Sequence, residues 1–172
     1  SLAALAQPSG TYDRAAADIT VDKVNWDGAY FTYLAPALFI RELESDYGAL
    51  TIEPATAAQI AYAQDQGYAT WGLSDAFDLC TTANPPPYLS RLGAPPAADT
   101  GDLEERDGLV TPHASALALI TSHAGEAVSN LQLLSSFPAL YHPTYGFKDS
   151  VLVRDPLAAD YGQASCTFSA LA

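Results

Sequence analysis

The chain contains no methionine, and basic residues are scarce. Seven lysines and arginines stand against 20 aspartates and glutamates, which gives a formal net charge of −13 over 172 residues. Such an acidic surface repels phosphate groups, so we expect no nucleic acid as a partner, and anionic membranes and polysaccharides are also disfavoured. A neutral ligand, a cation or a basic protein remains open. Because a translation start would supply methionine, we expect that the N-terminus at Ser1 arises by processing.

Long hydrophobic runs are missing as well. A membrane-spanning helix needs roughly 20 consecutive apolar residues, and the longest candidate, residues 30–40, is interrupted by Thr32 and Pro36. We therefore expect no membrane span. Hydrophobic residues nevertheless make up 49% of the chain and charged residues only 16%, which is typical of a folded protein with a real core. The length fits a single domain, residues 1–172.

Cysteine is nearly absent, and the two that occur limit the chemistry. Cys80 and Cys166 are too few for a usual zinc site, and neither belongs to a CxxC redox motif. Because both lie in loop-like sequence, we predict a disulfide between them, with two unlinked thiols as the alternative. This composition indicates an extracellular or periplasmic protein. Gly-rich phosphate loops, HExxH zinc pairs and GxSxG elbows are missing from the sequence, so we expect no cofactor and no metal.

Helical periodicity is present in the first half of the chain. In residues 26–47 apolar side chains recur at helical spacing, which predicts a helix. Pro36 predicts a kink or a late start in this helix, and Gly48 is placed to end it. A second helix is expected over residues 54–66, with a proline in its first turn and a glycine just past its end.

The second half shows similar signals. Thr111 and Pro112 mark the cap and first turn of a helix, and the sequence around Ser122 predicts that it breaks and restarts as a second helix. Residues 68–108 form a long irregular stretch, which in a compact domain is usually functional. The fold class is therefore mainly α, with helix pairs between long aromatic loops, as in a slice of an α/α barrel. The expected helices are too few to close such a barrel.

Four short motifs couple an aromatic residue or a glycine with a carboxylate. Flat rings stack on the apolar faces of neutral sugars, and carboxylates accept hydrogen bonds from sugar hydroxyl groups. The same carboxylates can act as acid, base or nucleophile in glycoside hydrolysis. The motifs are NWDGAYFTYLAP at 25–36, ATWGLSD at 69–75, DGLVTP at 107–112 and YGFKD at 145–149.

In this order the motifs resemble the glycoamylase-like family, which includes bacterial β-1,2-glucanases and a domain of cyclic β-1,2-glucan synthases. The family pattern has a WxGxxFEYLxP helix, a helix that ends at WGxS, a DGxxxP helix start and a YGF loop. The resemblance runs from about Trp26 to Val153 and corresponds to the C-terminal half of the family's barrel. It implies that residues 1–172 are the C-terminal section of a larger (α/α)6 barrel.

Most motif positions match the family, and one departs from it. The matching residues are Trp26, Gly28, Phe31, Tyr33, Leu34 and Pro36 in the first motif, Trp71, Gly72 and Ser74 in the second, Asp107, Gly108 and Pro112 in the third, and Tyr145, Gly146 and Phe147 in the fourth. Where the family has Glu after Phe, this chain has Thr32, whose hydroxyl cannot protonate a leaving group at neutral pH. The resemblance also implies a partner, a second polypeptide that supplies the N-terminal half of the barrel and its carboxylates.

The motifs nominate a set of site residues, and we expect their loops to face one shared cleft. The predicted catalytic residues are Asp27 and Asp75, and the predicted substrate-binding residues are Trp26, Tyr30, Trp71, Asp107, Tyr145 and Phe147. Structural roles are the alternatives, because Trp71 can fill a helix junction, Asp27 can cap the helix that follows it, and Asp107 can belong to a turn. Lys148 and Asp149 are interpreted as a local surface ion pair.

These observations support three hypotheses for the function. The leading one is a glycoside hydrolase that acts on a neutral oligo- or polysaccharide, in a hetero-complex with the missing N-terminal section. It would use two carboxylates across the scissile bond. The alternative is a non-catalytic carbohydrate-binding or structural subunit that kept the barrel and lost the acid at Thr32. The third is an interaction protein whose aromatic loops bind another protein.

Overall fold

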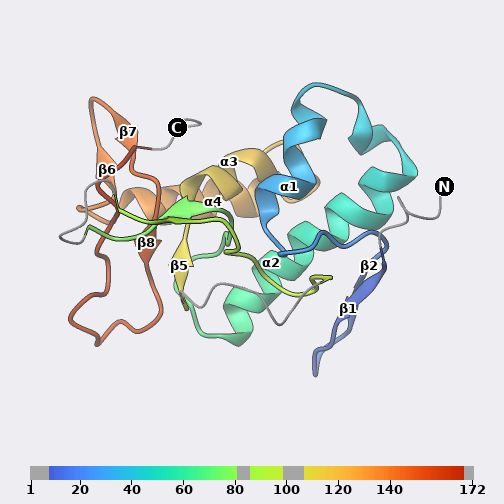
Figure 1. Cartoon of the computed structure of the whole chain (residues 1–172), viewed down its shortest axis with the longest axis horizontal. Coiled ribbons are helices and arrows are strands. Elements are labelled where there is room, and N and C mark those ends of the chain that lie inside the picture. Colours follow the sequence, from blue (N-terminus) through green and yellow to red (C-terminus); the bar gives the residue numbers. More distant parts are fainter. Residues whose placement is uncertain (1–7, 81–85, 99–106, 169–172) are drawn as a thin grey trace.

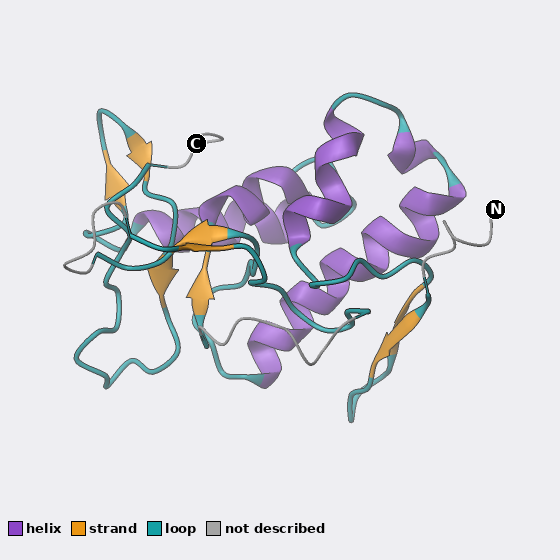
Figure 2. Ribbon diagram, viewed as in Figure 1, coloured by secondary structure: helices purple, strands orange, loops and turns teal. Residues whose placement is uncertain are grey.

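The computed structural model describes residues 8–80, 86–98 and 107–168. Its helices run through the middle of the molecule (Figures 1 and 2). The hairpin of β1 (Gly10–Tyr12) and β2 (Ile19–Val21) lies at one end of the long axis. The hairpin of β6 (Tyr141–His142) and β7 (Gly146–Phe147) lies at the other end.

The helix predicted over residues 26–47 is broken into short pieces. α1 covers only Tyr30–Leu34, and a 3-10 helix, η2, follows directly at Ala35–Leu38. Pro36 lies in the first turn of η2. Because proline has no N–H and clashes with the preceding turn of a helix, the α-helix ends where the sequence predicts a kink.

The chain then returns through two more short helical turns. A 3-10 helix, η3 (Glu42–Glu44), leads to a π-helix, η4 (Gly48–Ile52). The prediction that Gly48 ends a helix is therefore wrong, because this residue begins one. Its lack of a side chain serves a close approach, since a Cβ at this position would lie 2.6 Å from the Cα of Leu43.

α2 spans Glu53–Asp65 and confirms the helix predicted over residues 54–66. Pro54 lies in the first turn, where a helix does not use the missing N–H. Gly67, just past the end, has the left-handed φ of +73° that favours glycine. The buried residues of α2 are Ala55, Thr56, Ala58, Gln59, Ala61 and Ala63.

α3 (Pro112–Ala118) and α4 (Ala124–Ser135) confirm the predicted helix pair and the break between its members. At the break, the carboxylate of Glu53 accepts a hydrogen bond from the Ser122 N–H (3.0 Å). A negative charge is favourable just before α4, because the N-terminus of a helix carries a partial positive charge. The first turn of α2 is thereby connected to the start of α4.

The described residues also contain eight short strands that the sequence analysis did not predict. They form four antiparallel pairs, namely β1 with β2, β3 (Ala76–Phe77) with β4 (Tyr88–Leu89), β5 (Leu109–Val110) with β8 (Val151–Leu152), and β6 with β7. Strands of two or three residues are too short to show an alternating pattern. The prediction of a helix-rich chain is confirmed, with small sheets as an addition that was not predicted, and the (α/α)6 barrel stays a prediction.

The core consists of two clusters of buried side chains. The larger one lies among the helices and includes Tyr30, Leu34 and Trp71. The smaller one lies against the short strands and includes Leu73 and Leu109. The segment after α2 passes from the first cluster into the second, and this path carries it to the site described below.

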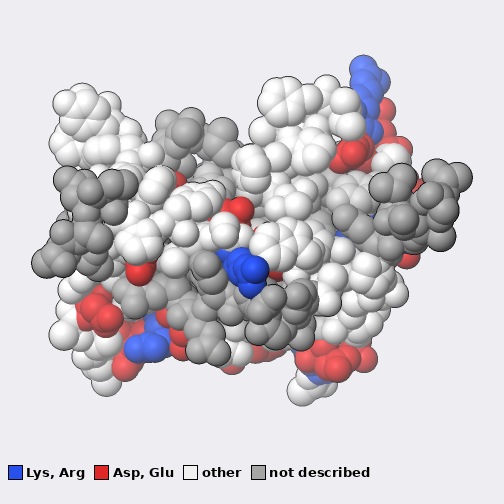
Figure 3. Space-filling model, in the orientation of Figure 1, with Lys and Arg blue, Asp and Glu red and all other residues white. Residues whose placement is uncertain are grey.

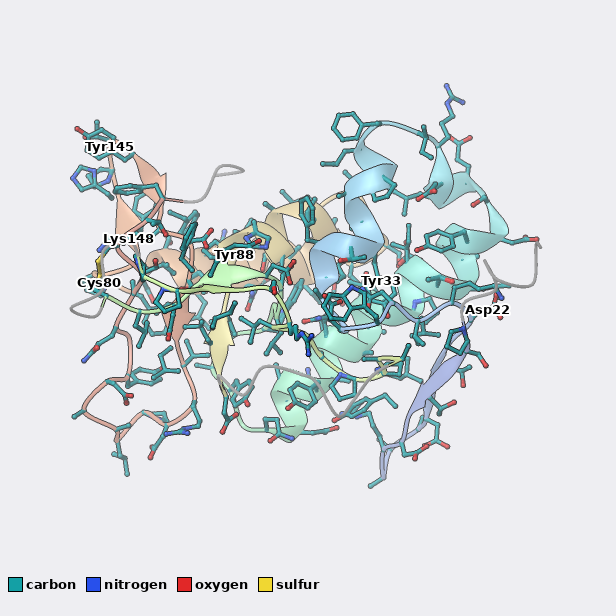
Figure 4. The ribbon with its side chains drawn as sticks, in the orientation of Figure 1. Asp22, Tyr33, Cys80, Tyr88, Tyr145 and Lys148 are labelled. Carbon is teal, nitrogen blue, oxygen red and sulfur yellow. A yellow bond between two sulfur atoms is a disulfide. The ribbon has the colours of Figure 1, made fainter. Side chains whose placement is uncertain are left out.

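Charged groups are unevenly distributed over the surface. In the face shown in Figure 3, acidic side chains gather along the lower edge and at the upper right, and the central part is mostly uncharged. The upper edge of this face is hollowed between two raised ends, and Tyr145 lies on one of them (Figures 3 and 4).

The predicted disulfide between Cys80 and Cys166 is confirmed. The Cα atoms of the two residues are 5.3 Å apart, and 86 positions separate them in the sequence. The bond joins the segment that follows β3 to the C-terminal part of the chain (Figure 4). Within the described ranges, no helix is long and apolar enough to cross a membrane.

Candidate functional site

The sequence motifs, which are far apart in the chain, are hydrogen-bonded to one another in the structure. The N–H of Phe31 in the first motif donates to the hydroxyl oxygen of Ser74 in the second (2.9 Å). The N–H of Thr111 in the third motif donates to the carbonyl oxygen of Gly72 (2.8 Å). The fourth motif lies near the third, because β8, which follows the fourth motif in the chain, pairs with β5 of the third motif.

Two buried amide side chains hold the second motif in place. Gln59 of α2 accepts from the Leu73 N–H (2.7 Å) and donates to the Leu73 carbonyl oxygen (2.9 Å). Asn130 of α4 accepts from the Trp71 N–H (3.2 Å) and donates to the Trp71 carbonyl oxygen (2.9 Å). Asn130 also donates to the hydroxyl oxygen of Ser115 (2.7 Å). One side chain from α2 and one from α4 therefore satisfy the backbone N–H and carbonyl groups of Trp71 and Leu73 and hold this segment in place.

Trp71 and Tyr30 are buried, which differs from the exposed stacking rings that the sequence predicts for them. Trp71 is only 6% exposed, and its ring meets that of Tyr30 edge-to-face at 6.4 Å. The hydroxyl groups of Tyr30 and Thr56 are hydrogen-bonded at 2.6 Å. Both aromatic rings thus fill the junction of α1, α2 and α4, and their predicted contact with a sugar has no support in this arrangement.

Asp27 is also buried, in a turn that precedes α1. Its Oδ1 accepts a hydrogen bond from the Ala29 N–H (3.0 Å), and burial raises the pKa of this carboxyl group. The turn packs directly against another backbone segment, because a Cβ on Gly93 would lie 2.0 Å from the Asp27 carbonyl oxygen. Asp27 does not cap α1, whose N-cap is Ala29; its carboxylate closes a turn before the helix instead. The predicted catalytic role of Asp27 stays untested.

Trp26 is the exposed ring of the first motif. It is 46% exposed, and the guanidinium carbon of Arg91 lies 5.3 Å from its ring centroid. A guanidinium over an indole is a favourable cation–π arrangement. Arg91 also lowers the pKa of Asp27 through its charge, although burial has the larger and opposite effect. Trp26 therefore has the exposure and the polar neighbour that a sugar-stacking residue requires.

The structure gathers two carboxylates around one exposed aromatic ring. Asp75 directly precedes β3, Asp149 accepts a hydrogen bond from the Phe77 N–H of β3 (2.6 Å), and Tyr88 of β4 pairs with Phe77. Burial raises the pKa of Tyr88, and the charges of Asp75 and Asp149 raise it further. The ring of Tyr88 packs edge-to-face on that of Phe77 at 5.1 Å, and Tyr88 lies in the centre of the view in Figure 4. We call Asp75, Tyr88 and Asp149 the carboxylate cluster.

Asp149 is held in this cluster by the backbone of β3. Its Oδ2 accepts a hydrogen bond from the Phe77 N–H (2.6 Å), and the neighbouring Ser150 hydroxyl donates to the Phe77 carbonyl oxygen (2.6 Å). Burial raises the pKa of Asp149, and the bond from Phe77 opposes this effect. The predicted surface ion pair with Lys148 is therefore not the main contact of Asp149. The position of Asp149 at the end of the fourth motif is the sequence signal that points to the site.

The predicted loop aromatics lie on the β6–β7 hairpin. Tyr145 is 65% exposed and stacks on the ring of His142 at 4.8 Å, with the ring of Phe168 at 5.5 Å. Phe147 is half-buried and meets Tyr141 edge-to-face at 5.0 Å. The hairpin thus carries an exposed aromatic surface at the end of the fourth motif, close in sequence to Asp149.

Asp107 has protein partners of its own. It accepts a hydrogen bond from the Tyr68 hydroxyl, and one of its carboxylate oxygens lies 3.6 Å from Nη1 of Arg154. Desolvation and this hydrogen bond raise the pKa of Tyr68. The contacts favour an anchoring role for Asp107 at the start of β5, and its predicted contact with substrate stays a prediction.

The helices, the small sheets and the contacts among the motifs together form an arrangement that is also present in known glucanase structures. This fold is found in solved structures of an endo-β-1,2-glucanase from Talaromyces funiculosus. A mutant in complex with β-1,2-glucan superposes with a TM-score of 0.70 at 16% sequence identity, over 93% of this chain. The complex with sophorose superposes with a TM-score of 0.71 at 18% identity, over 91% of this chain.

The match extends over only part of the glucanase. The chain spans 30–31% of the length of these two structures. No protein-family model and no curated protein sequence matches the chain. At such low identity the likeness shows the fold alone. At that level it confirms the resemblance to a section of a glycoamylase-like domain that the four motifs predict.

Proposed function

We propose that the chain is the C-terminal section of an (α/α)6 barrel that binds a neutral glucan and takes part in its hydrolysis. The observation that carries this proposal is the carboxylate cluster within a glucanase-like fold: Asp75 precedes β3, Asp149 is hydrogen-bonded to the β3 backbone, and the exposed Tyr88 pairs with β3. The matched glucanase was solved with β-1,2-glucan and with sophorose, so β-1,2-linked glucans are the ligands to test first.

The carboxylate cluster supplies the groups that glycoside hydrolysis requires. Such reactions use two carboxyl groups, one to protonate the leaving oxygen and one to act as base or nucleophile. A raised pKa makes the Asp149 carboxylate a stronger base and keeps its acid form to higher pH, and either property helps proton transfer. Asp75 is the predicted second group, and Trp26 and Tyr145 are the exposed rings for stacking.

The non-catalytic alternative rests on Thr32. This residue is exposed on α1, at the position where the family pattern has glutamate. A threonine hydroxyl does not release a proton near neutral pH, so the chain lacks one acid of the family pattern. A binding subunit would retain the exposed aromatic rings and would show no turnover.

The proposal also concerns assembly and location. The remaining part of the barrel would come from a second polypeptide or from a cleaved precursor, and the partial coverage of the glucanase supports this. A disulfide forms readily in oxidising compartments. The bond between Cys80 and Cys166 therefore supports an extracellular or periplasmic location.

Titration with sugars tests the proposal in the protein as its native host produces it. Sophorose and β-1,2-glucan should change the fluorescence of Trp26, and a β-1,4-linked glucan should have less effect. For an enzyme, Asp149→Asn should lower turnover by roughly 100-fold or more with little change in Kd. Asp46→Asn, at an exposed aspartate, is the matched control. If Asp149→Asn changes affinity alone, the chain is a binding subunit. If no neutral glucan binds, both the enzyme hypothesis and the binding-subunit hypothesis fail.

A further inference from the structure

α4 carries apolar side chains on three sides. Its core side is formed by Ala127, Asn130 and Leu134, which are buried. Val128 extends from one flank and is 45% exposed, and Leu133 extends from the other flank and is 44% exposed. A helix that is apolar on most of its circumference is normally enclosed by neighbours. α4 therefore has the side chains of an enclosed helix but exposes both flanks to solvent.

A groove runs along each exposed flank of α4. The first groove, of about 490 Å³, lies between α4 and α2 and is lined by Ile60, Gln64, Trp71, Gly125, Glu126, Ser129, Asn130 and Leu133. The second, of about 400 Å³, lies between α4 and the β6–β7 hairpin and is lined by Leu119, Val128, Leu131, Gln132, Ser135, Tyr141 and Phe147. We call them the α2 groove and the hairpin groove.

The chemistry of the two grooves favours a protein helix over a sugar or a charged ligand. Their linings contain one carboxylate, Glu126, although the whole chain has a net charge of −13. The apolar side chains of α4 that face the grooves are aliphatic and offer no stacking faces for sugars. The aromatic rings in the linings come from other elements: Trp71 is only 6% exposed, and Tyr141 and Phe147 are packed edge-to-face on each other. An amphipathic helix places its apolar face into a groove of this kind.

The matched structures indicate where such helices come from. The glucanase is about three times as long as this chain, since the chain covers only 30–31% of it. The strip of α4 between Val128 and Leu133 consists of Gly125, Ser129 and Gln132, which are exposed and form the outer edges of the two grooves. A helix with a polar outer strip and two apolar flanks fits a position with one neighbouring helix on each side.

We infer that the α2 groove and the hairpin groove are the two seams at which helices of the missing barrel section pack against α4. The occupants are amphipathic helices from outside the 172 residues, one on each side, with aliphatic side chains facing Leu133 in one seam and Val128 in the other. This surface is separate from the carboxylate cluster, and its assignment does not depend on the identity of the sugar.

Photo-cross-linking in the native protein or complex tests this assignment. The residue p-benzoylphenylalanine is placed at position 128, 133 or 157, one at a time. Leu157 is the matched control because it is 94% exposed and lies in neither groove lining. Mass spectrometry should find cross-links from positions 128 and 133 to helical segments outside the 172 residues, and none from position 157. Cross-links only to a second copy of these residues, or none above the control, would overturn the inference.

A charge at the seam gives a second, independent measurement. Leu133→Glu should lower the unfolding midpoint of the native assembly by roughly 4 °C or more relative to Leu157→Glu. Equal midpoints for the two variants would contradict the inference. If the cross-links form but no glucan binds, the proposed function fails and the seams stand. If glucans bind but positions 128 and 133 give no cross-links, the seam assignment fails and the proposed function stands.

Discussion

Replacing Asn130 by leucine is the sharpest test of how the second motif is held. Asn130 and leucine have similar length, so the change removes hydrogen bonds with little change in volume. The side chain of Asn130 makes one bond to the Trp71 N–H, one to the Trp71 carbonyl oxygen and one to the Ser115 hydroxyl. All these groups are in buried residues, so water does not readily replace the lost amide.

The expected loss of stability follows from these groups. Each buried polar group left without a partner costs about 1–3 kcal/mol. Three such groups, less about 1 kcal/mol for the added apolar contact, give an expected loss of roughly 2–8 kcal/mol for Asn130→Leu. A loss of this size is a large share of the roughly 5–15 kcal/mol that stabilises a typical domain.

Denaturant unfolding of the native protein measures the loss, with tryptophan fluorescence as the signal. Ser136→Ala is the control, because Ser136 is exposed at the end of the same helix, lies in neither groove lining and donates to the carbonyl oxygen of Leu133. It should change the unfolding free energy by less than about 0.5 kcal/mol. The reasoning is refuted if Asn130→Leu costs less than about 1 kcal/mol, which would mean that Trp71 finds other partners.

Three further predictions concern acid, reduction and a close backbone contact. Burial lowers the pKa of His113 to about 4, whereas the pKa of a histidine in the unfolded chain is near 6.5. Between these two pH values the unfolded state binds a proton that the folded state does not. The unfolding free energy should therefore fall by roughly 3 kcal/mol as the pH is lowered from 6.5 to 4. Subtracting the same titration of His113→Gln isolates this effect, and a flat difference would contradict it. Replacing Cys80 and Cys166 by serine should cost up to about 4–5 kcal/mol in the chain-entropy model, seen as a lower denaturation midpoint; an unchanged midpoint would count against it. Gly93→Ala should destabilise by roughly 3 kcal/mol or more, whereas Gly125→Ala, whose Cβ meets nothing within 4 Å, should not.

The sequence predicts those parts of the fold that local chemistry decides. α2 is marked at both ends by Pro54 and Gly67, and the break between α3 and α4 by the poor helix formers around Ser122. Pro36 indicates where α1 ends. In each case a backbone constraint within a few residues determines the outcome. The disulfide was predictable for a different reason, because two cysteines allow only one intramolecular pairing.

The remaining features depend on contacts between distant parts of the chain. Two-residue strands such as β5 and β8 form only because the tertiary fold brings them together. The burial of Trp71 follows from the amides of Gln59 and Asn130, whose partners cannot be read from their own surroundings in the sequence. In the sequence Asp149 looks like a surface residue beside Lys148, whereas in the structure its carboxylate is held by the distant Phe77 N–H. Such convergence was visible in the sequence only as the order of the four motifs.

The bond between Cys80 and Cys166 closes the backbone from one cysteine to the other into a covalent ring. A protease that cuts the backbone once inside this ring opens it but releases no fragment. Asp149 lies within the ring and Asp75 lies shortly before it, so a single cut leaves the two carboxylates on pieces that remain joined. A nicked molecule would migrate as one chain until it is reduced. The protein would thus tolerate damage in the long segment after β3 without losing half of its candidate site.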